Sequence, residues 1–221
     1  MFKQETLNKV NELIERYPQL KMCREDLNNA VKTLCESFHG GHKLLICGNG
    51  GSAADSQHIV GELMKGFLLP RSIVDFDYEL YKQLLTNYPD EVDYFTKNLQ
   101  CALPAISLVG ETALMTAFAN DQSSELIFAQ QVLGLGNAGD VLLAITTSGN
   151  SINVLHAVKI AKLKGLKTIA LTGRNGGKIK SLADISICAP ADSAYTIQEF
   201  HLPIYHMLCI AAESEFFSNN N

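Results

Sequence analysis

Apolar and polar residues follow one another along this chain in blocks that predict helices and buried strands. Two opening blocks space their apolar residues at helical intervals, over residues 4–16 and 24–38. Short runs rich in Leu, Ile and Val predict buried strands at 43–47, 105–109, 141–145 and 168–171, with a weaker one at 185–188. Helical segments separate these strands, at 53–64, 112–118, 125–133 and 152–163. A long last helix is expected from about Glu199 to Phe217.

This alternation predicts the fold class. Strands separated by helices are typical of βαβ crossovers, in which helices cover both faces of a mostly parallel sheet. The fold is therefore expected to be α/β. In such folds ligands bind beyond the carboxyl ends of the strands.

The turns after three of the predicted strands share a composition of Ser, Thr, Asn and Gly. They span residues 48–52, 146–151 and 172–177. Because the carboxyl ends of parallel strands meet at one edge of a sheet, these turns predict a single polar crevice. Helix capping explains one hydroxyl residue at a helix start. The 146–151 turn carries four, which favours an anion site for a sugar phosphate. The chain has no Walker loop or GxGxxG fingerprint, which disfavours a nucleotide.

Two side chains with functional chemistry follow the first glycine-rich turn. His58 and Glu62 are four residues apart in a predicted helix, so they fall on one helix face. The spacing suits metal ligation or acid–base chemistry. Two exposed polar residues would give the same pattern, and the nearby crevice is what favours a function.

The last predicted helix carries two more histidines, His201 and His206, and either one is a buried hydrogen-bonding residue or a functional group. Pro203 has no N–H for the carbonyl of Glu199, which predicts a helix start or a kink there. Gln198 and His206 would lie about 12 Å apart along an unbroken helix, too far to share a metal ion without a bend or long side chains.

Composition limits the possible classes of protein. The 221 residues are 47% hydrophobic and 19% charged, which fits one compact domain. A net charge of −5 argues against nucleic acid as the main ligand. Six acidic residues against one lysine between Ser72 and Asp93 form a separate acidic element. The six cysteines form no C-x-x-C pair, and no apolar run reaches membrane-spanning length, so a reduced, cytoplasmic protein is expected.

Together these motifs resemble the SIS (sugar isomerase) domain family, and within it the bacterial sedoheptulose-7-phosphate isomerases, also called phosphoheptose isomerases. The residues that carry the resemblance are 47–52, 120–121, 148–151 and 197–199. It covers nearly the whole chain except about Leu68 to Leu103. It implies one SIS domain over residues 1–221, built as a three-layer αβα sandwich. N-terminal helices would occupy residues 1–40, and residues 68–103 would be an insertion.

The resemblance also implies an activity and the residues that perform it. The reaction would be conversion of sedoheptulose 7-phosphate to D-glycero-D-manno-heptose 7-phosphate through an enediol, in a homotetramer with sites between subunits. Glu62 matches the family's base and His206 its acid. One zinc ion per subunit is implied, on His58, Glu62, Gln198 and His206. The substrate-contacting positions are matched by Asn49, Gly50, Gly51, Ser52, Glu62, Asn120, Asp121, Thr146, Thr147, Ser148, Ser151 and Gln198.

These residue types suit that reaction. Moving a carbonyl between C1 and C2 requires removal of a proton next to the carbonyl and its return to the neighbouring carbon. A carboxylate can carry the proton while an imidazole donates to the oxygen. Zinc or hydrogen-bond donors would stabilise the enediolate charge. The phosphate is expected on the 146–151 turn and the sugar on Asn49 to Gly51, close to Glu62.

Three features depart from the family pattern, and the first two bear on the identity of the sugar. The 68–103 region is longer and holds the excess acid, Tyr195 replaces an aspartate, and Thr146 replaces a serine. One alternative is a non-catalytic SIS domain, either a phosphosugar-binding protein or a replication-initiation adaptor. Such adaptors lack the acid and the imidazole that Glu62 and His206 provide here. The other is an isomerase of a different phosphosugar, with the insertion as a lid or a subunit contact.

Overall fold

One parallel sheet forms the centre of the molecule. The structure, a computed structural model, describes residues 2–218, so Met1 and residues 219–221 of the expected domain lie outside the described residues. The sheet has five strands in the order β2-β1-β3-β4-β5. They are β1 (Leu44–Gly48), β2 (Ala105–Ser107), β3 (Val141–Ile145), β4 (Lys167–Thr172) and β5 (Ile185–Cys188). Every neighbouring pair is parallel.

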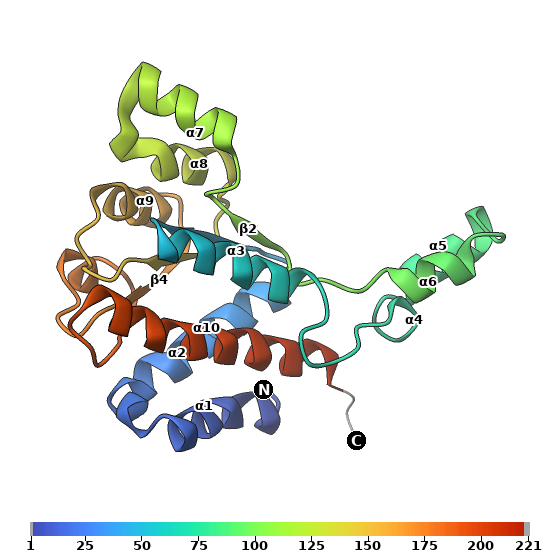
Figure 1. The fold of residues 1–221 in the computed structure, drawn as a ribbon. Helices are drawn as coiled ribbons and strands as arrows, with labels where there is room; N and C mark the ends of the chain where they lie inside the picture. The colour runs from blue at the N-terminus through green and yellow to red at the C-terminus, as the bar shows by residue number, and fades with distance from the viewer. Residues whose placement is uncertain (1, 219–221) are drawn as a thin grey trace.

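Helices cover both faces of this sheet (Figure 1). One face carries α2 (Arg24–His39), α3 (Gly51–Met64) and α10 (Ala194–Phe217), with α1 (Gln4–Arg16) packed outside α10. The other carries α8 (Ile127–Leu135) and α9 (Ile152–Leu163). Side chains of β1 alternate between the two hydrophobic clusters, because successive residues of a strand point to opposite faces. The predicted αβα architecture is confirmed.

The remaining elements are shorter. They are the 3₁₀ helices η1 (Pro18–Cys23), η3 (Ser124–Leu126) and η4 (Lys178–Ser181), the π-helical turn η2 (Ala119–Ser123), and α4 (Ile73–Phe76), α5 (Tyr78–Asn87), α6 (Val92–Asn98) and α7 (Thr112–Phe118). In the part of the chain that the structure describes, no helix is both long and apolar enough to cross a membrane.

Several predicted boundaries were wrong, the last helix most clearly. It begins at Ala194, not near Glu199, and it contains Pro203 in its interior. Proline removes one backbone hydrogen bond, whereas burial of residues on both sides of Pro203 favours a continuous helix. Smaller corrections apply to α3, which begins at Gly51, to α8, which is shifted by two residues, and to β2, which ends before a turn closed by Gly110 N–H and Ser107 O.

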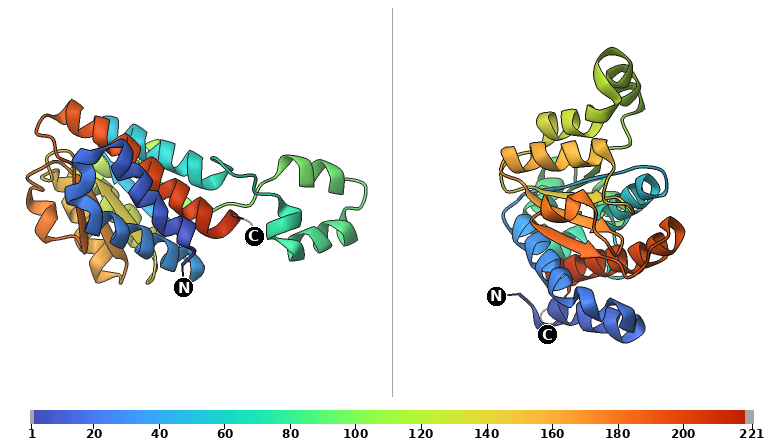
Figure 2. Two further views of the ribbon diagram at one scale, coloured as in Figure 1. Left: turned by 90° about the horizontal axis from the view of Figure 1, so that it is seen from below. Right: turned by 90° about the vertical axis from the view of Figure 1, so that its left-hand side faces the viewer.

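Residues 73–98 form an arm of three short helices, α4 to α6, that projects from the body (Figures 1 and 2). Few of its large apolar side chains are buried, namely those of Ile73, Leu84 and Val92. The six acidic residues of the predicted acidic element all belong to it. An antiparallel bridge between Ser72 and Gln100 holds its two ends side by side.

Candidate active site

The turn after β1 leads directly into α3, and glycine is required there. Gly50 adopts φ 57° and ψ −122°, a conformation that side-chain-bearing residues rarely reach. A Cβ on Gly51 would collide with the side chain of Gln198, so the first turn of α10 lies against the start of α3. Asn49 and Asn153 exchange two amide hydrogen bonds of 2.9 Å, which join this turn to α9.

The turns after β3 and β4 are joined through their backbones. Gly173 N–H donates to Thr147 O (3.1 Å), and Ile179 N–H donates to Gly149 O (3.0 Å). The Thr146 and Ser151 hydroxyl oxygens lie 3.0 Å apart, which ties the turn to the start of α9. The structure therefore brings the three predicted turns together at the carboxyl edge of the sheet, beside the first turns of α3, α9 and α10.

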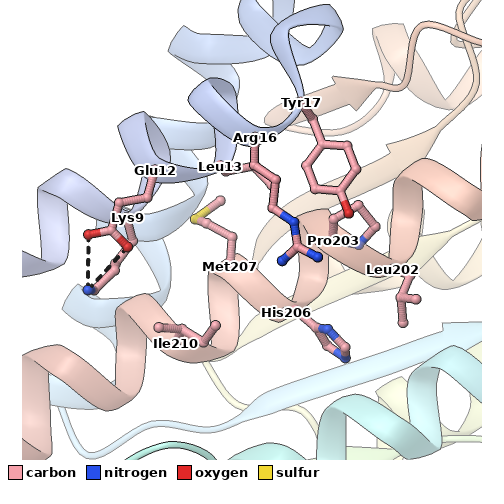
Figure 3. Close-up of a pocket in the computed structure, with 10 residues that line it drawn as sticks. All are labelled: Lys9, Glu12, Leu13, Arg16, Tyr17, Leu202, Pro203, His206, Met207 and Ile210. Carbon is pink, nitrogen blue, oxygen red and sulfur yellow. Dashed lines mark hydrogen bonds and ion pairs between the residues drawn. The ribbon is translucent and has the colours of Figure 1, made fainter.

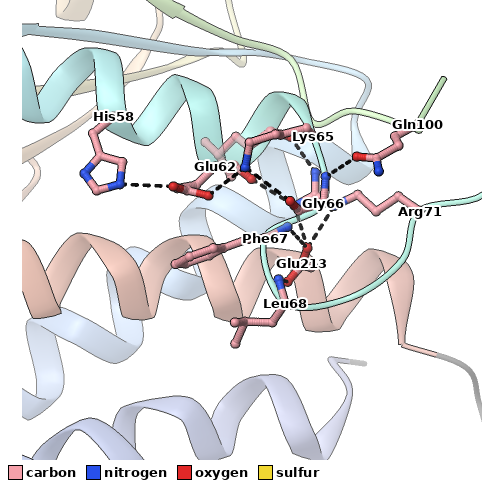
Figure 4. Close-up of polar contacts among 10 residues, drawn as sticks. His58, Glu62, Lys65, Gly66, Phe67, Leu68, Arg71, Gln100 and Glu213 are labelled. Atoms are coloured by element: carbon pink, nitrogen blue, oxygen red, sulfur yellow. Dashed lines mark hydrogen bonds and ion pairs between the residues drawn. The ribbon is translucent and has the colours of Figure 1, made fainter. Parts of the chain in front are cut away.

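A second polar cluster lies further along α3. His58 Nε2 and Glu62 Oε1 are 3.0 Å apart, and Lys65 Nζ donates to Glu62 Oε2 (3.2 Å) (Figure 4). On its other side, His58 Nδ1 lies 3.0 Å from the hydroxyl of Tyr205, which donates to Asp55 Oδ1 (3.3 Å). Burial raises the pKa of Asp55, against the opposing effect of the Tyr205 bond. Both nitrogens of His58 are thus held.

His206 of α10 completes this second cluster. Its ring lies 5.0 Å from that of His58, centroid to centroid, and perpendicular to it. His206 Nε2 is buried and has no hydrogen-bond partner among the described residues. Burial and the neighbouring His58 lower the pKa of His206, while Glu62 acts in the opposite direction. His206 also lines a hollow of about 490 Å³ between α1 and α10, together with Arg16 and Tyr17 (Figure 3).

The two clusters are separated along α3. This helix and α10 run side by side in the same direction, because Gln198 meets Gly51 and His206 meets His58. The rise per residue places Glu62 about 16 Å beyond Gly51 along the axis. The structure therefore brings His58, Glu62 and His206 together and leaves Gln198 at the other end of the helix.

Asn120 and Asp121 join neither cluster within one chain. They are exposed on η2, where Asn120 Nδ2 donates to Asp121 Oδ1 (2.8 Å). The preceding helix, α7, has no buried residue. Figure 1 shows α7 beyond α8, on the opposite side of the sheet from α10.

The structure settles the role of His201 and shows three residues of the site that the sequence analysis did not identify. His201 is a buried residue whose Nε2 lies 3.3 Å from Thr172 O, and burial lowers its pKa to about 4. Asp55 and Lys65 could have been suspected from the sequence, because they lie near His58 and Glu62 on the same helix face. Tyr205 could not, since its partner belongs to a different helix.

The four residues expected to hold zinc do not lie together in the structure. Two imidazoles and a carboxylate are ligand types that zinc accepts, and His206 Nε2 has no hydrogen-bond partner in the described part of the chain. However, His58 Nε2 is already bonded to Glu62, and Gln198 lies at the far end of α3. Among residues 2–218, no group of three or more His, Cys, Asp or Glu is arranged to hold a metal ion. The residues do not fit a four-ligand zinc site in this arrangement.

Comparison with known proteins points to one family. Residues 7–102 and 107–210 each match the SIS domain. A phosphoheptose isomerase of Helicobacter pylori is 40% identical over 201 residues, which cover 91% of this chain and 90% of that protein. The structure of a phosphoheptose isomerase from Neisseria gonorrhoeae superposes with a TM-score of 0.71 at 33% identity, covering 92% of this chain and 94% of that one. A phosphoheptose isomerase from Francisella tularensis gives the same TM-score and identity over 94% and 98%.

Proposed function

The chain belongs to the SIS domain family, among its phosphoheptose isomerases, and we propose that Glu62 and His206 are the groups that isomerise its substrate. The protein is a phosphosugar isomerase that interconverts sedoheptulose 7-phosphate and D-glycero-D-manno-heptose 7-phosphate. The assignment of roles to individual residues is the proposal.

One observation carries this assignment: a carboxylate and an imidazole of α3 lie together with a second imidazole from α10. Glu62 removes the proton next to the substrate carbonyl and returns it to the neighbouring carbon. His206, whose Nε2 has no hydrogen-bond partner among residues 2–218, exchanges a proton with the substrate oxygen. His58 lies within hydrogen-bond distance of Glu62 Oε1 and so orients the carboxylate for removal of the proton.

The joined turns at the carboxyl edge of the sheet form the binding part of the proposal. The 146–151 turn precedes α9, where free backbone N–H groups and the helix dipole favour an anion. We assign the substrate phosphate to Thr146, Thr147, Ser148 and Ser151. The sugar is assigned to the adjacent turn after β1 and to the starts of α3 and α10, at Asn49, Gly50, Gly51, Ser52 and Gln198; of these, Ser52 is buried.

The complete site is proposed to lie between subunits of a homotetramer. Within one chain, the binding turns and Glu62 are at opposite ends of α3, and Asn120 and Asp121 are exposed in the helical segment 112–126, which has no buried residue. A second copy that covers α7 would bring one subunit's Asn120 and Asp121 to another's acid–base cluster. Most soluble oligomers are symmetric homo-oligomers, so every subunit would contribute the same residues to a neighbouring site.

Two further expectations stay proposals. Cytoplasmic location is supported by six free cysteines and is checked by cell fractionation. One zinc ion per subunit enters no step above. Elemental analysis of protein purified without chelator tests it: one equivalent of zinc would support the ion implied by the family resemblance, and an absence of metal would contradict it.

The substitution Glu62→Gln tests the function directly. It keeps the size of the side chain but removes the base, so turnover of sedoheptulose 7-phosphate should fall by about 100-fold or more while sugar-phosphate binding persists. An unchanged rate would exclude Glu62 as the base. Exchange of solvent deuterium into C2, across a panel of ketose phosphates, identifies the substrate. No exchange with any of them would favour the non-catalytic adaptor.

A further inference from the structure

The arm is attached to the same end of α3 that carries Glu62. Arg71 lies at the base of the arm and is 1% exposed. Its guanidinium donates to the carbonyls of Glu62 (3.1 Å) and Leu63 (2.5 Å) in the last turn of α3 (Figure 4). Carbonyls of a last helical turn have no partner within the helix. Arg71 therefore caps the turn on which Glu62 stands.

A buried ion pair fixes Arg71 in place. Its Nε donates to Glu213 Oε1 (3.0 Å), and both side chains are 0% exposed. Glu213 also accepts the N–H groups of Phe67 (2.7 Å) and Leu68 (2.8 Å). The segment that leaves α3 is thus held to α10 at three points, so its path relative to Glu62 is fixed.

The second segment that joins the arm to the body is bonded to the same helix end. Gly66 N–H donates to Gln100 Oε1 (2.7 Å), and Cys101 N–H donates to Arg71 O (2.8 Å). Leu103 N–H donates to Leu63 O (3.0 Å). Both connections of the arm, residues 70–72 and 99–103, are therefore hydrogen-bonded to the residues at the end of α3.

We propose that Arg71 and Gln100 are positioning residues for Glu62, and that through them the arm is coupled to the reacting carboxylate. The inference rests on the proposed role of Glu62 as the base. Glu62 is two residues from the end of α3, and Lys65, which bonds its Oε2, is followed directly by the Gly66 amide that Gln100 holds. A shift of about 1 Å at a reacting group can lower a rate by about 100-fold.

Gln100 offers the cleaner test because its side chain is exposed, so its loss leaves the fold intact. Gln100→Met removes the acceptor for Gly66 N–H, whereas Gln100→Glu keeps an oxygen there. We expect Gln100→Met to lower kcat about 10-fold with little change in KM, and Gln100→Glu to restore it. The same substitution at an exposed glutamine of the arm, Gln83→Met, is the matched control and should leave kcat unchanged.

Arg71 is tested by two variants. Arg71→Lys keeps a charge beside Glu213 but cannot reach both carbonyls, so kcat should fall with KM little changed. Because an unpaired buried charge can unfold the protein, the double variant Arg71→Met/Glu213→Gln removes both charges at once. It should fold and show the same loss of kcat.

Amide hydrogen exchange separates this inference from the proposed function. Faster exchange at Gly66 in Gln100→Met, with normal exchange in Gln100→Glu, reports the position of the helix end whatever the reaction is. Wild-type kcat in Gln100→Met and in the Arg71 variants, despite that faster exchange, would overturn the coupling. An unaltered rate in Glu62→Gln would instead overturn the proposed base.

Discussion

Tyr205 connects the two helices of the acid–base cluster through a single hydroxyl group. It lies between His58 Nδ1 and Asp55 Oδ1, and the ring itself is 1% exposed. The second oxygen of Asp55, Oδ2, is buried and has no partner among the described residues. The orientation of His58, and hence of its bond to Glu62, depends on this hydroxyl.

Tyr205→Phe should weaken both the fold and the reaction. The ring stays in place, but His58 Nδ1 and Asp55 lose a partner, and an unsatisfied buried polar group costs about 1–3 kcal/mol. We expect a lower denaturation midpoint and a reduced kcat, measured by urea unfolding and by steady-state kinetics. Tyr78→Phe, at an exposed position of the arm, is the control. A variant with wild-type kcat would show that His58 does not need the hydroxyl.

Asp140 holds the opposite edge of the sheet, where β1 and β3 begin. Burial alone would raise its pKa, but hydrogen bonds from Lys43 Nζ and from the N–H groups of Lys43 and Asn137 hold the pKa below its usual value. A depressed carboxyl pKa means that the ionised form stabilises the folded state above the unfolded pKa of about 3.9. That contribution is lost as the pH falls through the folded value.

Asp140→Asn should therefore lower stability at neutral pH and flatten its dependence on acid. Asparagine keeps one acceptor oxygen but loses the charge and the second oxygen. A hydrogen bond to a charged group is worth about 1.5–3 kcal/mol, so a loss of at least about 2 kcal/mol is expected. The difference between the two proteins in free energy of unfolding, measured in urea between about pH 7 and pH 3, should narrow toward the acid end. A constant difference across that range would contradict the assigned ionisation.

At the scale of elements, periodicity and composition predicted most of the sheet and its covering helices. Buried strands read as continuous apolar runs, and this is why β3 and β5 were placed correctly. The start of α10 was missed because Pro203 is a local signal, whereas the helix is held by packing along its whole length. Pairs such as His58 with Tyr205, or Arg71 with Glu213, could not be predicted, because each depends on how two segments far apart in the sequence are placed in space.

Pro203→Ala tests whether packing overcomes an unfavourable residue in α10. Proline in a helix interior costs up to about 3 kcal/mol, because it leaves one carbonyl without its N–H. Alanine can donate to Glu199 O, so the variant should be more stable than the wild type by about 1 kcal/mol, after allowing for the greater freedom of its unfolded chain. Thermal unfolding measures this. A lower melting temperature would mean that the proline ring contributes packing that alanine lacks.

At the scale of the whole molecule, a single chain does not explain why α7 has an exposed apolar face. Helix α7 buries none of its residues. Leu114, which is 43% exposed, forms an apolar face of this helix together with Ala117 and Phe118. This helix precedes Asn120 and Asp121, which the proposed site requires. A second subunit packed on α7 would cover the apolar face and complete the site in one step.

Leu114→Arg places a charge in that proposed contact and leaves the core of each subunit untouched. Burying an unpaired charge at an interface is strongly unfavourable, so the variant should elute as a smaller species, with an unchanged circular dichroism spectrum and a large loss of kcat/KM. Leu163→Arg, at a leucine that is 82% exposed on α9, is the matched control and should remain assembled and active. A Leu114→Arg protein that is dissociated yet fully active would show that one subunit holds a complete site. In that case a sugar phosphate bound at the 146–151 turn would have to reach Glu62 within the same chain.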